Sequence, residues 1–514
     1  MKGPATQHLL PRGIKIALFV LLAALCLARN LPWNVDDYDQ AKQAFVSLEI
    51  ADTGAWWFQH TPSGKIATKP PLAGWISAAL RPWVGWDVAW RLPSFLATLA
   101  MGGVLWRAGS GVLPGGGGIL AVCAFGFTLL TPRLATLVRT DMLLALWIFL
   151  AGWMVWTRLE RGVGWTTRDR WVLAGIVAAA LLTKGPILYA FLLPAVVTWP
   201  LLRRRGWVSS PAGTGVWPWV VPLMLFLAWA GVGIALSPEF REQVVVREFL
   251  GRFTSGEGAV HKSQPPWFYV IHLTHKLAPW SLLLAWLGWQ TWRREPPGRT
   301  GTPESKVVKS ALTDADRWLI VWALGGLIVM SLIPSKRVDR VFALAPVLAL
   351  LIPVLLRALG GWEPHARWLR ITILIAVLAA TGYAVARPIQ AFRDDEGALA
   401  RWCREVNGSR LAHGWRLGVV RSPREGVTVY LRESRPLSLG EARSAWRRGD
   451  LDAMVLLESD YTRSDWGERG IVRSRVSIPD NKGDTVLVTH PRLSEPPGNR
   501  GGERLGSGGL RERR

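Results

Sequence analysis

The strongest constraint on the fold of this chain is a succession of eleven apolar runs, which occupy most of its first 388 residues. The runs are 14–28, 92–106, 119–130, 142–156, 171–182, 187–202, 216–236, 267–289, 318–333, 341–356 and 371–385. Several approach the roughly 20 residues that a helix needs to cross a bilayer. One such run is equally typical of a buried helix in a soluble protein, but eleven in succession indicate an integral membrane protein. We therefore predict a mainly α fold, a polytopic membrane helix bundle of about 11–13 spans.

The basic residues predict how the chain is oriented in the membrane. The net charge is +24, but Lys and Arg are concentrated between the apolar runs and in the C-terminal tail, without a motif for binding nucleic acid. Cytoplasmic loops of membrane proteins collect such residues. Lys2, Arg12 and Lys15 place the N-terminus in the cytoplasm, and the arginine-rich gaps after the even-numbered runs return to that side. The odd-numbered gaps and the C-terminal region are then predicted to be external.

The chain changes character after residue 388, where short runs typical of strands replace the long apolar ones. We predict strands at 417–420, 427–431, 453–457, 472–476 and 485–489, and a helix at 441–446. The predicted organisation is a transmembrane domain at 1–388, a small external α/β domain at 389–494 and a disordered tail at 495–514. The three cysteines, Cys26, Cys123 and Cys403, are widely separated. We expect neither a disulfide framework nor a metal site, and no cofactor.

Ionisable residues gather in the gaps that are predicted to be external. The candidates are Asp36, Asp37, Lys69, Asp141, Lys184, His261, Lys336 and Arg337. Such side chains beside membrane spans are costly unless they are paired or used, so their convergence at one membrane face predicts a functional site. The loop 237–266 is long enough to serve as a substrate cover, and its His261 is either a binding residue or a surface histidine.

Two motifs in the first external loop, 31–91, supply the strongest candidates. Asp36 and Asp37 either provide a catalytic carboxylate or cap a helix predicted over 40–50. Lys69 precedes two prolines, which restrict its backbone to an extended conformation. A lysine held in this way suits a phosphate or a carboxylate, and the alternative is a lysine that snorkels at the start of the next helix. The loop 31–91 is therefore predicted to be the catalytic loop.

The later gaps contribute further charged candidates. Asp141 opens the fourth run, where it either joins the site or only complements the helix dipole. Lys184 precedes a Gly-Pro pair at the end of a run, and its alternative role is that of a helix cap. Lys336 and Arg337 put positive charge on the external side, against the orientation rule. This placement predicts an anionic partner, such as a lipid phosphate.

The order of these motifs resembles a known family. The residues that carry the resemblance are Asp36-Asp37 with Gln40-Ala41, Lys69-Pro70-Pro71-Leu72 with Trp75 and Arg91-Leu92-Pro93-Ser94, Leu182-Thr183-Lys184-Gly185-Pro186, and Ser335-Lys336. They are similar to the acidic start, the KPPL motif and the later basic loops of polytopic lipid-linked glycosyltransferases. That family includes bacterial aminoarabinose transferases and eukaryotic protein O-mannosyltransferases. The resemblance covers residues 14–360 in order and spacing, and the C-terminal domain is only loosely similar to the external domain of some members.

The resemblance implies roles for individual residues. By their place in the motifs, Asp36 matches the catalytic aspartate, Lys69 the lysine of the donor phosphate, Asp141 a second acidic position, and Lys184 and Lys336 basic positions around the cavity. Two residues depart from the family pattern. Asp37 stands where the family has Glu, and Thr68 stands where Glu often precedes the KPPL motif.

The resemblance also implies a fold of the GT-C type and a sugar donor carried on a polyprenyl phosphate such as undecaprenyl phosphate. Transfer would proceed with inversion on the external face of the cell inner (plasma) membrane. Release of a phosphate leaving group requires cations rather than a general acid. A hydroxyl acceptor requires a base, a role that fits Asp36, whereas a phosphate acceptor, as on lipid A, is already nucleophilic.

These expectations define a leading hypothesis and two alternatives. The leading hypothesis is a membrane glycosyltransferase, a hexosyl- or pentosyltransferase. It would move a sugar from a polyprenyl-phosphate carrier to a lipid, glycan or protein acceptor of the cell envelope. One alternative is a transporter or flippase for a lipid-linked substrate, which predicts ionisable groups near the bilayer midplane. The other is a non-catalytic envelope scaffold or sensor.

Overall fold

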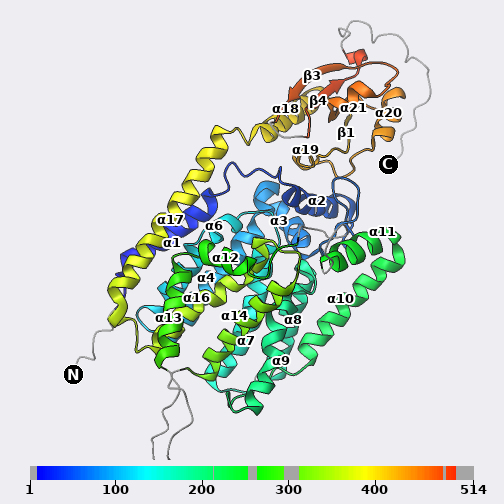
Figure 1. The fold of residues 1–514 in the computed structure, drawn as a ribbon. Coiled ribbons are helices and arrows are strands. Elements are labelled where there is room, and N and C mark those ends of the chain that lie inside the picture. The colour runs from blue at the N-terminus through cyan, green and yellow to red at the C-terminus, as the bar shows by residue number, and fades with distance from the viewer. Residues whose placement is uncertain (1–7, 212, 253–262, 295–311, 479–481, 494–514) are drawn as a thin grey trace, which may run out of the picture. The chain divides into compact units, whose positions relative to one another are not determined.

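The chain folds into two compact units. The computed structural model describes residues 8–211, 213–252, 263–294, 312–478 and 482–493. The first unit comprises Met1–Thr61 with Lys65–Gly397, and the second comprises Pro62–Gly64 with Ala398–Arg514. Helices dominate the first unit, and the second contains a four-stranded sheet (Figure 1).

The helices of the first unit follow the apolar runs. They are α1 (Arg12–Ala28), α2 (Tyr38–Thr53), α3 (Leu72–Ala89), α4 (Leu92–Val112), α5 (Gly117–Gly126), α6 (Thr131–Leu134), α7 (Asp141–Arg161), α8 (Thr167–Lys184), α9 (Ile187–Arg204), α10 (Trp217–Leu236), α11 (Pro238–Phe240), the π-helix η1 (Arg241–Phe249), the 3₁₀ turn η2 (Leu250–Arg252), α12 (Phe268–Lys276), α13 (Trp280–Arg294), α14 (Asp314–Leu332), α15 (Val338–Val341), η3 (Phe342–Leu344), α16 (Ala345–Ala358), η4 (Glu363–His365) and α17 (Ala366–Arg393). Every predicted apolar run lies wholly or mainly in helix, which confirms the mainly helical fold.

Six helical segments of the described chain are long and apolar enough to cross a membrane. They are α7, α9, α10, α14, the continuous segment Val338–Ala358 and the segment Glu363–Arg393. A seventh arises if α3 and α4, bent by 91° relative to each other, form one span. Pro93 at the start of α4 lacks the N–H that would continue α3, which explains the break. The polytopic bundle is confirmed, and the higher count of 11–13 spans stays a prediction.

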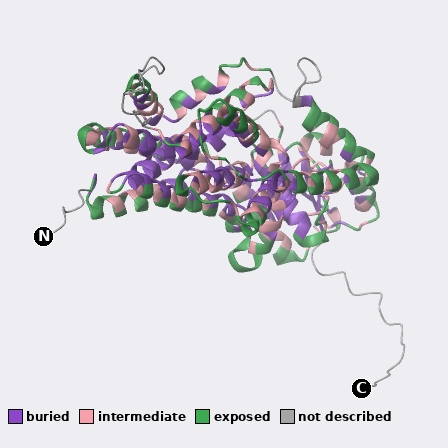
Figure 2. Ribbon diagram, turned by 90° about the horizontal axis from the view of Figure 1, so that it is seen from below, coloured by how far each residue is buried: buried purple, intermediate pink, exposed green. Residues whose placement is uncertain are grey.

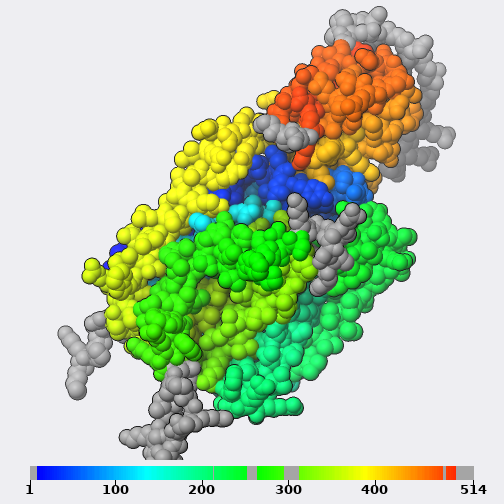
Figure 3. All heavy atoms as spheres, viewed as in Figure 1, coloured from blue at the N-terminus to red at the C-terminus, as the bar shows by residue number. Residues whose placement is uncertain are grey.

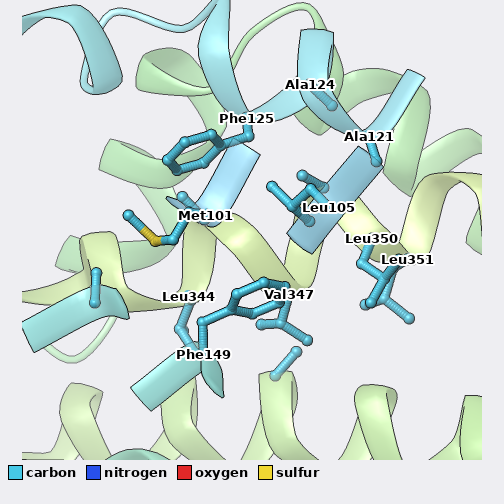
Figure 4. Packing of buried hydrophobic residues seen from close by; sticks show 14 of the residues in the cluster. Met101, Leu105, Ala121, Ala124, Phe125, Phe149, Leu344, Val347, Leu350 and Leu351 are labelled. Atoms are coloured by element: carbon cyan, nitrogen blue, oxygen red, sulfur yellow. The ribbon is translucent and has the colours of Figure 1, made fainter. Parts of the chain in front are cut away.

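The core of the first unit lies between α4, α5, α7 and α16. Met101 of α4, Phe125 of α5 and Phe149 of α7 are at most 1% exposed and point into the same space (Figure 4). Gly109 and Gly117 let the backbones of α4 and α5 touch, because a Cβ on Gly117 would lie 2.1 Å from the Gly109 carbonyl oxygen. Figure 2 shows that buried residues gather inside the bundle and exposed residues outside it.

The outer helices of this unit present apolar side chains outward. Helix α17 packs along α1 at one edge (yellow and blue in Figures 1 and 3). On α10, Met224 is 52% and Leu225 is 66% exposed. An apolar helix face turned away from the protein is typical of contact with lipid.

The second unit has the mixed α/β character that the sequence predicted. Its strands are β1 (Leu417–Val419), β2 (Ala453–Leu457), β3 (Ile471–Val476) and β4 (Thr485–Thr489), in the order β1-β2-β4-β3. Strands β1 and β2 are parallel, and β4 is antiparallel to both β2 and β3. Its helices are α18 (Ala398–His413), α19 (Gly426–Tyr430), α20 (Leu439–Arg447), α21 (Glu458–Arg463) and the 3₁₀ turn η5 (Pro491–Leu493).

One strand prediction in this unit is wrong. The run 427–431 forms most of α19, which packs on α18, rather than a strand. Val427 and Val429 are both buried, and a short, fully buried apolar run has no periodicity that separates a helix from a strand. The predicted helix at 441–446 is confirmed as α20. The unit begins at Ala398, beyond the end of α17, whereas the sequence placed a boundary after residue 388.

Candidate active site

A polar cavity of about 310 Å³ lies where helix ends and loops from distant parts of the helical unit meet. Its walls come from α2, the segment before α3, the ends of α7 and α8, η1 and the segment 337–340. The charged residues that line it are Asp39, Lys42, Lys65, Lys69, Arg139, Asp141, Lys184, Arg247, Glu248, Arg337, Asp339 and Arg340. Four residues predicted from separate gaps, Lys69, Asp141, Lys184 and Arg337, are thereby brought together.

In the acidic start of the loop 31–91, Asp37 caps a helix and Asp39 lines the cavity. Asp37 is the N-cap of α2, and its carboxylate accepts a hydrogen bond from the Asp39 N–H at 3.1 Å. The capping alternative is therefore confirmed for Asp37, which also pairs with Arg139. Asp39 lines the cavity, whereas Asp36 is not among its lining residues. The catalytic role of Asp36 stays a prediction.

Asp39 is held between two arginines. Its Oδ2 lies 2.7 Å from the Arg337 Nη2 and 3.6 Å from the Arg139 Nη2. Burial acts to raise the pKa of Asp39, but the nearby charges of Lys69 and Arg337 outweigh it and hold the pKa well below its ordinary value. Asp39 is therefore ionised at neutral pH, and it fixes the positions of the cations around it.

Lys69 brings an ammonium group to the cavity without a fixed partner. Lys69 lies in the segment that leads into α3, and Pro71 is the N-cap of that helix. Within the described residues, no hydrogen bond or ion pair engages its side chain. Burial lowers the pKa of Lys69 to about 8, and the carboxylates of Asp39 and Asp141 act against this lowering. A cation that lines a cavity and has no hydrogen-bond partner among the described residues is a candidate binding group for an anion.

The chain that approaches Lys69 is anchored by Glu49 of α2, a residue that the sequence analysis missed. The Glu49 carboxylate accepts a hydrogen bond from the His60 N–H at 2.6 Å, and it lies 2.7 Å from the His60 Nδ1. His60 also forms an isolated antiparallel bridge with Ile66. Glu49 is 8% exposed. The one sequence signal for its role was the position of a carboxylate on the buried face of the helix predicted over 40–50.

Asp141 and Lys184 form an ion pair across two helices. Asp141 is the first residue of α7, and Lys184 is the last residue of α8. The two side chains are each 10% exposed and hydrogen-bonded. Gly185 ends α8 with a φ of 72°, which a residue with a side chain rarely adopts. The turn therefore leaves the ammonium of Lys184 at the edge of the cavity.

Asp339 is a second residue that the sequence analysis missed. It lies in α15 and is 8% exposed. Its Oδ1 lies 2.8 Å from the Arg133 Nη1, and its Oδ2 lies 3.0 Å from the Arg139 Nη1. Arg139 thus links Asp339 to the acidic residues at the start of α2. No motif surrounds Asp339, and its role depends on partners about 200 positions earlier in the chain.

Lys336, like Asp36 and Asp37, is not among the residues that line the cavity. Lys336 is 5% exposed, and its ammonium donates a hydrogen bond to the Gln264 carbonyl oxygen at 2.8 Å. It therefore anchors the last residues of the loop 237–266. His261 lies outside the described residues, as does the tail 495–514. The described part of that loop forms α11, η1 and η2, and η1 contributes to the cavity wall.

A larger apolar cavity of about 950 Å³ adjoins the polar one. Residues of α9, α10, α14 and η1 line it. The two cavities share the lining residues Thr68, Lys69, Lys184, Glu248 and Arg340. Lys69 and Lys184 therefore lie where the polar cavity meets the apolar cavity. In the described part of the chain, no cluster of three or more His, Cys, Asp or Glu could hold a metal ion.

Comparison with known proteins points to one group. An undecaprenyl phosphate-alpha-4-amino-4-deoxy-L-arabinose arabinosyl transferase of Sodalis glossinidius is 27% identical over 297 residues, which cover 55% of this chain and 51% of that protein. The transferase of the same name from Edwardsiella ictaluri is 26% identical over 372 residues, which cover 71% of this chain and 62% of that protein. The chain thus spans about half to three fifths of these relatives. No family model matches it.

The solved structures settle the fold. ArnT from Cupriavidus metallidurans bound to undecaprenyl phosphate superposes with a TM-score of 0.65 at 17% identity, covering 95% of this chain and 100% of that chain. The chain has the ArnT fold. The resemblance to aminoarabinose transferases that the motifs predicted is confirmed. Of the residues that carried the resemblance, Lys69 and Lys184 line the polar cavity.

Proposed function

We propose that this chain is a membrane glycosyltransferase that takes a sugar from a polyprenyl-phosphate carrier. One observation carries the proposal, namely that Lys69 and Lys184 line both the polar and the apolar cavity. A polyprenyl-phosphate sugar has the matching order of parts, a long apolar chain, then a phosphate, then a polar ring. Its chain would occupy the apolar cavity, its phosphate would meet Lys69, and its sugar would enter the polar cavity.

The charges of the polar cavity suit the departure of a phosphate. Transfer breaks the bond between the sugar carbon and the phosphate oxygen through an oxocarbenium-like transition state, and negative charge grows on the phosphate. Preorganised cations stabilise that charge. Lys69 lines both cavities and has no hydrogen-bond or ion-pair partner among the described residues, so it is available to the donor. Arg337 is already oriented by Asp39 at 2.7 Å. A general acid is not required.

The nucleophile comes from the acceptor, a lipid, glycan or protein group of the envelope. Attack on the face of the sugar opposite the phosphate gives inversion. If the acceptor is a hydroxyl, Asp36 remains our candidate base. Asp36 directly precedes Asp37, the N-cap of α2, and is not among the residues that line the polar cavity. If the acceptor is a phosphate, no base is required.

Further support comes from the relatives and from the arrangement of charge. The names of the relatives contain undecaprenyl phosphate, which is a carrier of the proposed class. The cavity-lining residues come from gaps that the positive-inside rule places on the external side. We therefore propose a multi-pass protein of the inner membrane with a cytoplasmic N-terminus and an external C-terminal unit.

The proposal is tested with purified protein in proteoliposomes that contain polyprenyl-phosphate sugars and an envelope-lipid extract as acceptor. Wild type is expected to transfer sugar, and Lys69→Met is expected to lose at least about tenfold in kcat/KM, because a charge-assisted hydrogen bond to the phosphate is lost. Lys276→Met removes a lysine outside both cavities and serves as the matched control. Asp36→Asn tests the base. Movement of the lipid across the bilayer without sugar transfer would favour the transporter alternative instead.

A further inference from the structure

Gln43 is a buried side chain of the polar cavity, and no described residue forms a hydrogen bond with its amide. It lies on α2 one helical turn after Asp39, so the two share a helix face. It is 7% exposed and lines the polar cavity. Among the described residues, no hydrogen bond to its side-chain amide is found. The amide offers two donors and one acceptor to the cavity.

Gln40, on the same helix, provides a comparison because its side-chain amide is hydrogen-bonded. Gln40 is 6% exposed, and its Oε1 accepts a hydrogen bond from the Val138 N–H at 3.1 Å. Gln40 does not line the polar cavity. The Gln43 amide has no such partner among the described residues and lines the polar cavity, where a ligand group can hydrogen-bond to it. The unengaged amide of Gln43 therefore points to a ligand group in the cavity.

The charged neighbours of Gln43 restrict what that ligand group is. Three carboxylates of the cavity are committed to cations, namely Asp39 to Arg337 at 2.7 Å, Asp141 to Lys184, and Asp339 to Arg139 at 3.0 Å. The fourth, Glu248, is also not free. The charged lining residues comprise eight Lys or Arg and four Asp or Glu. An ammonium on the ligand would meet net positive charge, whereas a hydroxyl can bond to Gln43 at no electrostatic cost.

We propose that Gln43 selects the donor sugar by hydrogen bonding to a hydroxyl, and that the preferred sugar is uncharged rather than an amino sugar. The inference rests on the proposed function and names the substrate class of that same site. The cavity of about 310 Å³ equals the volume of about ten waters. That space suits a single sugar ring rather than an oligosaccharide. Gln43 is a specificity residue, and the phosphate remains the partner of Lys69.

The test uses the full-length protein in proteoliposomes and the variant Gln43→Met. Methionine has a similar volume and no amide, so the variant keeps the packing of α2 and removes an unsatisfied polar group. Its melting temperature should equal or exceed that of wild type. Gln40→Met is the matched control, with the same exchange on the same helix at a residue outside the cavity. It should lower the melting temperature and leave the choice between donors unchanged.

The donors are polyprenyl-phosphate pentoses and hexoses, each compared with the derivative in which one hydroxyl is an amine. Wild type is expected to prefer the neutral member of the pair. Gln43→Met should lower kcat/KM for that neutral donor about tenfold, which is the loss of one or two neutral hydrogen bonds. Binding of the polyprenyl phosphate without a sugar should not change.

Three outcomes would overturn the inference, and they are distinguishable. If wild type transfers no sugar from any donor, the proposed function and this inference fail together. If wild type transfers sugar and Gln43→Met has the same kcat/KM on every donor, only the role of Gln43 fails. If wild type prefers the amino sugar, the substrate class is wrong, because a carboxylate must then be free to pair with the ammonium.

Discussion

Raising the pH should weaken binding of the lipid phosphate through one side chain, Lys69. Burial lowers the pKa of Lys69 to about 8, against the opposing charges of Asp39 and Asp141. The free protein therefore loses the Lys69 proton between neutral pH and pH 10, a range in which an ordinary lysine stays charged. A bound phosphate favours the ammonium form, so binding and protonation are linked. Affinity for the phosphate must fall as the pH rises through 8.

The size of the effect follows from the pKa. With a value of about 8, about 90% of the Lys69 side chains are protonated at pH 7 and about 1% at pH 10. If only the ammonium form binds, the Kd rises about 90-fold between these pH values, equal to about 2.7 kcal/mol. A hydrogen bond to a charged group contributes about 1.5–3 kcal/mol. Loss of a contact of this size allows the full rise, so the Kd should increase by about 90-fold between pH 7 and pH 10.

The assay measures the Kd of undecaprenyl phosphate for the detergent-solubilised protein at half-unit steps from pH 7 to pH 10. The second pKa of a phosphate monoester is about 6, so the charge of the ligand is constant over this range. Lys69→Arg is the matched control, because a guanidinium keeps its proton at every pH used. Its Kd should stay flat. A flat Kd in wild type, or an equal rise in Lys69→Arg, would refute the assignment of the phosphate to Lys69.

Two further predictions concern residues that position the site. Asp339→Asn leaves the guanidinium groups of Arg133 and Arg139 without this buried partner and should destabilise the protein by about 3 kcal/mol. The same exchange at the exposed Asp394 should leave the melting temperature unchanged. Equal melting temperatures for the two variants would contradict the structural role of Asp339. Glu49→Gln weakens the anchor of His60 ahead of Lys69 and should raise KM for the donor about threefold with kcat retained. Steady-state kinetics measure this, and a fall in kcat alone would contradict it.

The sequence predicted the helices well and the site in part, for different physical reasons. Long apolar runs have few alternatives, so every run became helix. Lys69, Asp141 and Lys184 were found because each lies beside a proline, a helix start or a Gly-Pro turn. Such local signals survive in a single sequence. The predicted strand at 427–431 failed because a short buried run carries no local signal of this kind.

The remaining site residues depend on distant partners, which a single sequence does not reveal. Asp339 looks like an ordinary loop acid until the fold brings Arg133 and Arg139 to it. Gln43 and Gln40 are three residues apart and are buried to nearly the same degree, yet only the structure separates the lining residue from the one bonded to Val138. Tertiary contacts across the bundle, rather than motifs, decide these roles.

The polar cavity contains arginines that are held by carboxylates and a lysine that is free of hydrogen-bonded partners among the described residues. This arrangement explains how the cavity would favour sugar transfer. Its acids orient arginines before any substrate arrives, as Asp39 does with Arg337 and Asp339 does with Arg139. Preorganised dipoles and charges need no reorganisation at the transition state. Lys69 and Gln43 have no hydrogen-bond partner in the described structure, and burial disfavours the charged form of Lys69. A protein partner for either group would remove a contact that the cavity offers to its substrate. We therefore expect these two groups to recognise the donor, Lys69 through its phosphate and Gln43 through its sugar.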